Sequence, residues 1–236
     1  MSIELTHPLS SHIPTWNGSC GFSAVIKKDY DKMFRVQKIE MHAGIGTHMD
    51  APSHRFEGMG SIADIPLETL VVPACVIDVR KKAHADYEIS LEDIKAYEHQ
   101  HGKIPQKSLV LGFTGWSRFW NEPKAYRNED DNGQMHFPAF SEEAALLLLE
   151  REIAGLGIDT FSPDCLDLSY PVHRHILGSG KYIIENIADC SLMPPSHAYA
   201  IALPLRAVDC TECPIRLIGV PSGTFPEKKD DLNRKT

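Results

Sequence analysis

Three side chains that can bind a metal ion or move a proton lie within one short segment of this 236-residue chain. Residues 46–54 read Gly-Thr-His-Met-Asp-Ala-Pro-Ser-His, which brings His48, Asp50 and His54 close together in the sequence. A histidine and an aspartate two positions apart on an extended segment point to the same side of the backbone. Zinc and manganese ions accept this pairing of imidazole nitrogen and carboxylate oxygen. The segment therefore predicts a metal centre that serves hydrolysis.

The same segment also has purely structural interpretations. Gly46 and Pro52 flank the chemical groups and predict an irregular but fixed backbone rather than a helix. His48 could cap a turn, Asp50 could form an Asx-turn before the proline, and His54 could be an ordinary loop histidine. The clustering of the three favours a metal ligand role for the first two and an acid/base role for the third.

A second chemical segment covers residues 173–186 and pairs a histidine near a short helix with a carboxylate at the end of an apolar strand. Burial of the Glu185 carboxylate is costly without a partner, and a metal ion relieves that cost. The alternative partners of Glu185 are Arg174 and backbone amides. His175 competes with His173 as the functional histidine, with a solvent-facing position as its structural interpretation.

The first motif, followed by Ser-Ile-Ala-Asp-Ile-Pro-Leu-Glu at 61–68, resembles the cyclase family, which includes bacterial-type kynurenine formamidases and isatin hydrolases. Weaker matches follow along nearly the whole chain in the order of that family. They lie at 114–116, 157–164, 173–186 and 202–205.

The resemblance implies a metal-dependent hydrolase of C–N amide bonds in small aromatic or cyclic amides, similar to an arylformamidase. It implies the metal ligands His48, Asp50, His173 and Glu185, the acid/base residue His54, and one or two zinc or manganese ions per chain. It also implies a homo-oligomer, a dimer or a tetramer. The implied fold is α/β, with a mixed, largely antiparallel sheet or barrel-like β core and flanking helices, of the swivelling β/β/α, cyclase-like type.

One position departs from the motif. Kynurenine formamidases begin it as His-x-Gly-Thr-His, and Gly44 stands here where that family has its first histidine. His42, two residues earlier, is a candidate replacement, with an ordinary sheet or loop position as its alternative. Without this ligand a two-metal centre could become a one-metal centre, for which the other four candidates suffice.

Aromatic side chains could line a pocket for an aromatic substrate. The candidates are Trp16, Phe22 and Trp116, for each of which core packing is the default.

Two thiol alternatives are weaker. Cys165 could act as a nucleophile, although nothing in the sequence indicates a lowered pKa. Cys210 and Cys213 form a lone Cys-x-x-Cys, which by itself is weak evidence for zinc.

The elements that must position these groups are mostly strands. Apolar or alternating runs predict strands at 34–41, 70–79, 108–113, 157–161, 182–187, 199–205 and 215–220. Capping residues predict helices at 90–101 and 141–154, and a short helix at 171–177. A regular doubly wound fold would need more helices between its strands, so a mixed α/β fold is expected.

Composition narrows the function classes. A net charge of −8 without a basic block argues against nucleic-acid binding, and the small-molecule substrate is what the resemblance implies. No apolar stretch has the length of a membrane span, the N-terminus does not resemble a secretory signal, and six scattered cysteines indicate a reduced, cytoplasmic protein.

The chain is expected to form one domain over 1–226, with a polar tail at 227–236. The long polar segment 121–139 is predicted as a lid or an oligomer contact. Two alternatives to the arylformamidase reading remain open: a hydrolase of isatin, cyclic imides or lactones from the same family, and a non-catalytic metal- or metabolite-binding protein.

Overall fold

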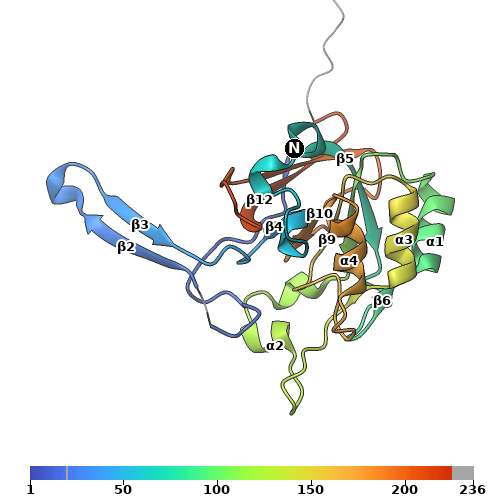
Figure 1. The fold of residues 1–236 in the computed structure, drawn as a ribbon, viewed down its shortest axis with the longest axis horizontal. Coiled ribbons are helices and arrows are strands. Elements are labelled where there is room, and N and C mark those ends of the chain that lie inside the picture. Colours follow the sequence, from blue (N-terminus) through green and yellow to red (C-terminus); the bar gives the residue numbers. More distant parts are fainter. Residues whose placement is uncertain (20, 225–236) are drawn as a thin grey trace, which may run out of the picture.

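The computed structural model describes residues 1–19 and 21–224 (Figure 1). The strands are β1 Ile3–Glu4, β2 Ser23–Lys28, β3 Val36–Glu40, β4 His48–Asp50, β5 Val71–Asp78, β6 Glu88–Ile89, β7 Leu109–Phe113, β8 Ala139–Phe140, β9 Gly155–Ile158, β10 Tyr182–Glu185, β11 Ala198–Pro204 and β12 Glu212–Pro221. The α-helices are α1 Leu91–His101, α2 Pro123–Arg127, α3 Glu142–Glu150 and α4 Pro171–Gly178.

The main sheet of the described residues is mixed and closes into a barrel. Its order is β1-β12-β11-β5-β7-β9-β10-β4, and β4 returns to pair with β12. The neighbours β5, β7, β9 and β10 run parallel, whereas the pairings that involve β4, β11 and β12 are antiparallel. This architecture confirms the predicted α/β fold with a barrel-like β core.

The parallel half of the barrel is covered on both sides, which explains its continuous apolar sequence. Leu109 and Leu111 of β7 belong to the cluster inside the barrel, and Val110 between them belongs to the cluster beneath the helices. Helices α1, α3 and α4 lie together on this outer side (Figure 1). Two hydrophobic layers therefore hold the strands in place.

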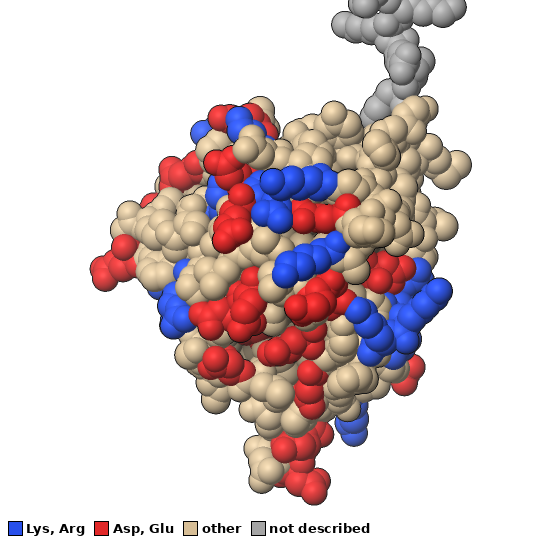
Figure 2. Space-filling model, turned by 90° about the vertical axis from the view of Figure 1, so that its right-hand side faces the viewer, with Lys and Arg blue, Asp and Glu red and all other residues tan. Residues whose placement is uncertain are grey.

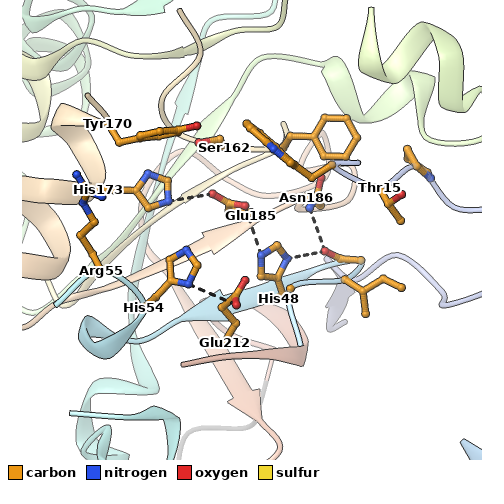
Figure 3. Close-up of a pocket in the computed structure, with 16 residues that line it drawn as sticks. Thr15, His48, His54, Arg55, Ser162, Tyr170, His173, Glu185, Asn186 and Glu212 are labelled. Atoms are coloured by element: carbon orange, nitrogen blue, oxygen red, sulfur yellow. Dashed lines mark hydrogen bonds and ion pairs between the residues drawn. The ribbon is translucent and has the colours of Figure 1, made fainter. Parts of the chain in front are cut away.

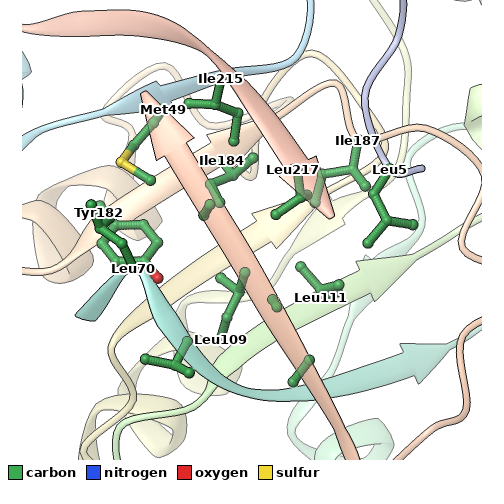
Figure 4. Close-up of a cluster of buried hydrophobic side chains, with 14 of the residues drawn as sticks. Leu5, Met49, Leu70, Leu109, Leu111, Tyr182, Ile184, Ile187, Ile215 and Leu217 are labelled. Carbon is green, nitrogen blue, oxygen red and sulfur yellow. The ribbon is translucent and has the colours of Figure 1, made fainter. Parts of the chain in front are cut away.

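The barrel interior is filled with large aliphatic side chains (Figure 4). Leu5, Met49, Ile184 and Leu217 are each fully buried there, although they come from four different strands or strand ends. Full burial of such a side chain contributes about 1.5–3 kcal/mol. Met49 lies between His48 and Asp50, so its burial anchors the chemical motif to the core.

The helices start where the capping residues predict them. The Ser90 hydroxyl accepts a hydrogen bond from the backbone N–H of Asp93, and the Asp93 carboxylate accepts one from the backbone N–H of Ser90. The two bonds form a capping box before α1. Ser141 accepts the backbone N–H of Ala144 and starts α3 in the same way. The prediction for α3 was too long, because the helix ends at Glu150 rather than at 154.

Other boundaries also differ from the prediction. β9 lies at Gly155–Ile158, two residues earlier than expected at its start, and β12 begins at Glu212 rather than at 215. The polar segment 121–139 contains α2, and the hydroxyl of its buried Tyr126 donates to Asn186 Oδ1 at 2.9 Å. The sequence did not indicate that Tyr126 is buried, because its neighbours in the chain are mostly charged.

Strands β2 and β3 form a separate two-stranded arm that extends away from the barrel (Figure 1). Every residue of both strands is exposed. Only β3 was predicted. The arm leads directly into the loop before β4.

Acidic and basic side chains are interspersed on the face that carries α1 and α3 (Figure 2). Among the described residues, no helix is long and apolar enough to cross a membrane. The predicted polar tail at 227–236 lies outside the described residues.

Candidate active site

Strand β4 places two of the predicted ligands at the centre of the site. Gly46 adopts a φ of 63°, a conformation that favours glycine, and the chain then becomes extended over His48–Asp50. Because alternate side chains of a strand share a face, His48 and Asp50 point to one side, as their spacing indicated. Their nearest atoms, Nε2 of His48 and Oδ1 of Asp50, are 3.5 Å apart.

Strand β10 brings Glu185 to the same face. In the antiparallel pairing of β4 with β10, Glu185 lies opposite His48. Its Oε2 is 3.4 Å from Nε2 of His48, and its Oε1 is 3.4 Å from Nε2 of His173 (Figure 3). Two distant sequence segments therefore meet around one carboxylate.

Helix α4 contributes His173 from the opposite side, and Asp164 fixes its orientation. The Asp164 carboxylate accepts the backbone N–H groups of Val172 at 2.8 Å and His173 at 3.0 Å, and its Oδ2 is 2.7 Å from Nδ1 of His173. Nε2 of His173 then faces Asp50, with 3.6 Å to Oδ2. A carboxylate behind a histidine in this way is a common support for a metal ligand.

The ring of His48 is fixed by a similar contact. Its Nδ1 is 2.9 Å from the carbonyl oxygen of Gly46, which can only accept a hydrogen bond, so Nδ1 carries the proton. The Asn186 amide donates to the same carbonyl at 3.1 Å. Nε2 of His48 is therefore the ring nitrogen that faces the carboxylates.

The buried cluster is strongly coupled. Burial opposes a charge on His48, but the hydrogen bond with Glu185 and the Asp50 charge outweigh it and raise the pKa of His48 to about 10. Burial opposes a charge on His173 as well, yet contacts with Asp164, Asp50 and Glu185 raise its pKa well above the ordinary value. Although burial acts in the other direction, both histidines lower the pKa of Glu185. Protons on the imidazoles thus balance the carboxylates.

The donor set fits a divalent metal ion. Oδ1 of Asp50 is buried and has no hydrogen-bond partner, which is costly for a carboxylate oxygen unless a cation binds it. Ligand atoms of Asp50, His54 and His173 lie within 4.8 Å of one another, as do those of His48, Asp50 and Glu212. Imidazole nitrogens and carboxylate oxygens of this kind suit zinc or manganese.

His54 lies beside the ligand candidates and is more exposed than they are. It ends the 3-10 turn Pro52–His54, and its Nδ1 is 3.4 Å from Oε2 of Glu212. The hydrogen bond with Glu212 raises the pKa of His54, although partial burial acts in the opposite direction. The ring centroids of His54 and His173 are 6.1 Å apart. A partly exposed histidine here can exchange protons with a bound substrate.

A cavity of about 390 Å³ opens beside these groups, and its lining includes His48, His54, His173, Glu185 and Glu212. Trp16, Phe161 and Tyr170 contribute aromatic surface to its walls. Of the three predicted pocket aromatics, only Trp16 lines this cavity. Trp116 is buried in the adjoining core, where its Nε1 donates to the Tyr126 carbonyl, and Phe22 packs at the edge of that core.

Two other histidines lie elsewhere. The ring of His42 packs against Gly21 and does not line the cavity. Nε2 of His175 is 2.6 Å from Glu142, which also pairs with Arg174. Arg174 and His175 thus contact Glu142 of α3. Arg174 is therefore not the partner of Glu185, and His175 does not replace His173 in the site.

The structure adds residues that the sequence interpretation missed. Glu212 lies between Cys210 and Cys213, a segment that the sequence interpretation considered only for its cysteines. All described cysteines are free thiols. Asp164 lies seven residues before the start of α4, so no local capping signal marked its contact with His173. Burial raises the pKa of the Cys165 thiol to about 11, which opposes a role as a nucleophile.

Comparison with known proteins gives consistent matches. A family model described as "Putative cyclase" matches residues 3–165. Kynurenine formamidase of Bacillus mycoides (strain KBAB4) is 28% identical over 92% of this chain and 95% of its own length. The structure of isatin hydrolase A from Labrenzia aggregata bound to benzyl benzoate is 32% identical, with a TM-score of 0.86 over 94% of this chain and 93% of that one. A predicted metal-dependent hydrolase from Bacillus stearothermophilus is 26% identical, with a TM-score of 0.70 over 93% and 97%.

Proposed function

Since the chain belongs to the cyclase family, we propose that it is a metal-dependent hydrolase of a C–N amide bond in a small aromatic or cyclic amide. The observation that carries this proposal is the convergence of His48, Asp50, His173 and Glu185 beside His54. All of these residues except the buried Asp50 line one cavity. Relatives named kynurenine formamidase and isatin hydrolase act on compounds of this class according to their names.

The four ligand candidates would hold the ion, zinc or manganese, with one or two ions per chain. When bound, such an ion acidifies water and polarises a carbonyl group. Asp164 and the Gly46 carbonyl keep both imidazoles in the tautomer that leaves Nε2 available.

His54 is the acid/base residue in this proposal. It accepts a proton from water at one ring nitrogen and donates a proton to the leaving nitrogen as the amide bond breaks. Glu212 raises the pKa of His54, so the imidazole retains its proton at a higher pH and suits the donating step.

The aromatic walls would orient the substrate. Trp16 packs edge-on against Phe161, with ring centroids 6.2 Å apart, which leaves ring faces available for a planar substrate. Arg55, also in the lining, would attract a substrate carboxylate.

The test is hydrolysis of N-formylkynurenine, isatin and a panel of lactones by metal-depleted protein reloaded with zinc or with manganese. We expect formamide hydrolysis that requires added metal and is lost with a chelator. The second candidate, an isatin, cyclic imide or lactone hydrolase, is favoured by the 32% identity to isatin hydrolase A and would appear as ring opening instead. Metal binding without turnover of any compound would support the alternative that the chain is a non-catalytic metal- or metabolite-binding protein.

We further propose a homo-oligomer, a dimer or a tetramer, in the reducing cytoplasm. The free thiols of the described cysteines agree with a reducing setting. The exposed apolar side chains of the β2–β3 arm need a partner surface, which a second copy of the chain would supply.

A further inference from the structure

Gly44 and Glu212 compete for the same space at the edge of the site. A Cβ atom built on Gly44 would overlap Oε1 of Glu212 and lie 3.4 Å from Nε2 of His48. Gly44 does not have a positive φ, so its backbone would accept another residue. In the observed arrangement, the Glu212 carboxylate occupies the space that a side chain at position 44 would take.

Strand pairing explains how Glu212 reaches this space. In the antiparallel pairing of β12 with β4, Glu212 lies opposite Asp50, and Pro214 lies opposite His48. Side chains that face each other across two strands share one face of the sheet. Glu212 thus extends the row of candidate ligands from β10 and β4 onto a third strand, with its oxygen within 4.8 Å of ligand atoms of both His48 and Asp50.

We propose that Glu212 is a metal ligand and that it takes the place of the imidazole that kynurenine formamidases carry at the position of Gly44. This inference rests on the proposed metal-dependent function. The ligand position that Gly44 cannot fill is then occupied by Glu212 from the distant strand β12. The donor set contains three carboxylates, Asp50, Glu185 and Glu212, where two would remain without it.

The exchange has a consequence for metal preference. Carboxylate oxygen suits manganese, whereas imidazole nitrogen suits zinc. A site with Glu212 in place of a histidine is therefore shifted towards manganese, relative to the same site with the histidine.

Calorimetric titration of the metal-free full chain with MnCl₂ and ZnCl₂ tests the ligand role. We expect Glu212→Gln and Glu212→Ala to weaken manganese binding at least ~10-fold. Glu68→Gln, at an exposed carboxylate on the turn Leu67–Thr69, is the control and should bind as the wild type does. Thermal unfolding of the metal-free variants checks that each one is folded.

Substitutions at Gly44 test the shared space. Gly44→Ala should displace the flexible end of Glu212 and weaken manganese binding in the wild-type background. It should have no further effect in Glu212→Ala, because the displaced group is already absent. The double exchange Gly44→His with Glu212→Gly should restore binding and raise the affinity for zinc relative to manganese.

The outcomes separate the two proposals. A wild-type chain that binds neither metal contradicts the proposed function and this inference together. A wild type that binds metal, with Glu212→Gln and Glu212→Ala at wild-type affinity, overturns only the role of Glu212 as a ligand. In that case a lower turnover of Glu212→Gln, with a shifted pH profile, would assign Glu212 to the positioning of His54 instead.

Discussion

At the candidate metal centre, each of two histidines has one ring nitrogen bound to a fixed acceptor. The Gly46 carbonyl holds Nδ1 of His48, and Asp164 holds Nδ1 of His173. The opposite nitrogens are thereby aimed at Asp50 and Glu185 before any metal binds. Such preorganisation lowers the conformational cost of metal binding.

The residues around this centre should separate metal binding from proton transfer. We expect His54→Ala to keep the metal and to lose turnover by about 10²–10⁴-fold, the usual contribution of an acid/base residue. Asp50→Ala should lose both, because its buried oxygen is a ligand in the proposal. Elemental analysis and steady-state kinetics of both variants measure the two quantities.

His175→Ala is the matched control, since this histidine contacts Glu142 outside the cavity, and both quantities should stay at wild-type values. Wild-type turnover of His54→Ala would exclude the acid/base role. Loss of metal from His54→Ala would instead assign His54 to the ligand set that it can reach with Asp50 and His173.

At the scale of elements, one carboxylate supports both the start of α4 and the histidine on its first turn. Asp164 accepts two backbone N–H groups at the start of α4 and also orients His173 on the first turn. The helix end and the candidate ligand thus share one support. A change at Asp164 moves the ligand even though Asp164 itself does not contact the cavity.

Asp164→Asn should weaken metal binding by roughly 10–100-fold, which is typical for the loss of a group that supports a ligand. The amide oxygen can still accept a backbone N–H, so the free energy of unfolding should change much less than metal affinity. Calorimetric titration and urea unfolding of the metal-free protein measure the two effects. Glu142 of α3 pairs with Arg174 and His175 of α4 outside the cavity, so Glu142→Gln should leave metal affinity unchanged. An equal loss of affinity in both variants would contradict the prediction.

For the whole molecule, a half-buried histidine couples stability to pH. The ring of His7 stacks on Trp120 with 4.0 Å between ring centroids. Burial lowers the pKa of His7 to about 4, although a backbone hydrogen bond with Ile187 acts in the opposite direction. The unfolded chain takes up this proton below about pH 6.5, but the folded chain takes it up only below about pH 4. The unfolded state is therefore favoured increasingly as the pH falls through this interval.

His7→Phe keeps a ring against Trp120 but cannot take up a proton. Relative to this variant, the wild type should lose about 2 kcal/mol of unfolding free energy between pH 8 and pH 5. Urea unfolding of metal-free protein at both values measures the difference. A difference that does not change with pH would show that His7 is not the group responsible.

The arm formed by β2 and β3 belongs to the same scale, because the proposed oligomer would be built on its exposed strands. Val25, Ile26 and Ile39 are exposed on its strands, and an isolated two-stranded hairpin is marginally stable in water. Replacement of 23–40 by a short Gly-Ser linker should lower the molecular mass measured by light scattering to that of a smaller oligomer or a monomer. The linker is feasible because Ser23 and Glu40 are paired across the hairpin.

The milder variant Val25→Ser with Ile39→Ser should weaken assembly without loss of the barrel. An unchanged mass in both variants would place the oligomer interface elsewhere or show that the chain is monomeric.

The local sequence was sufficient to predict features that depend on residues close together in the chain. Strand periodicity located β5, β7, β10 and β11, and caps located the starts of α1 and α3, because these signals depend on near neighbours. The spacing of His48 and Asp50 likewise predicted that they share a face, since a strand repeats every two residues.

Only the tertiary structure brought the two motifs and the third strand together. Closure of the barrel places β4 between β10 and β12, so Glu185 and Glu212 flank a strand that lies more than a hundred residues before them. Read along the sequence, Gly44 was a missing ligand. In the fold, it leaves the space that Glu212 occupies, because packing depends on which surfaces meet and not on their order in the chain.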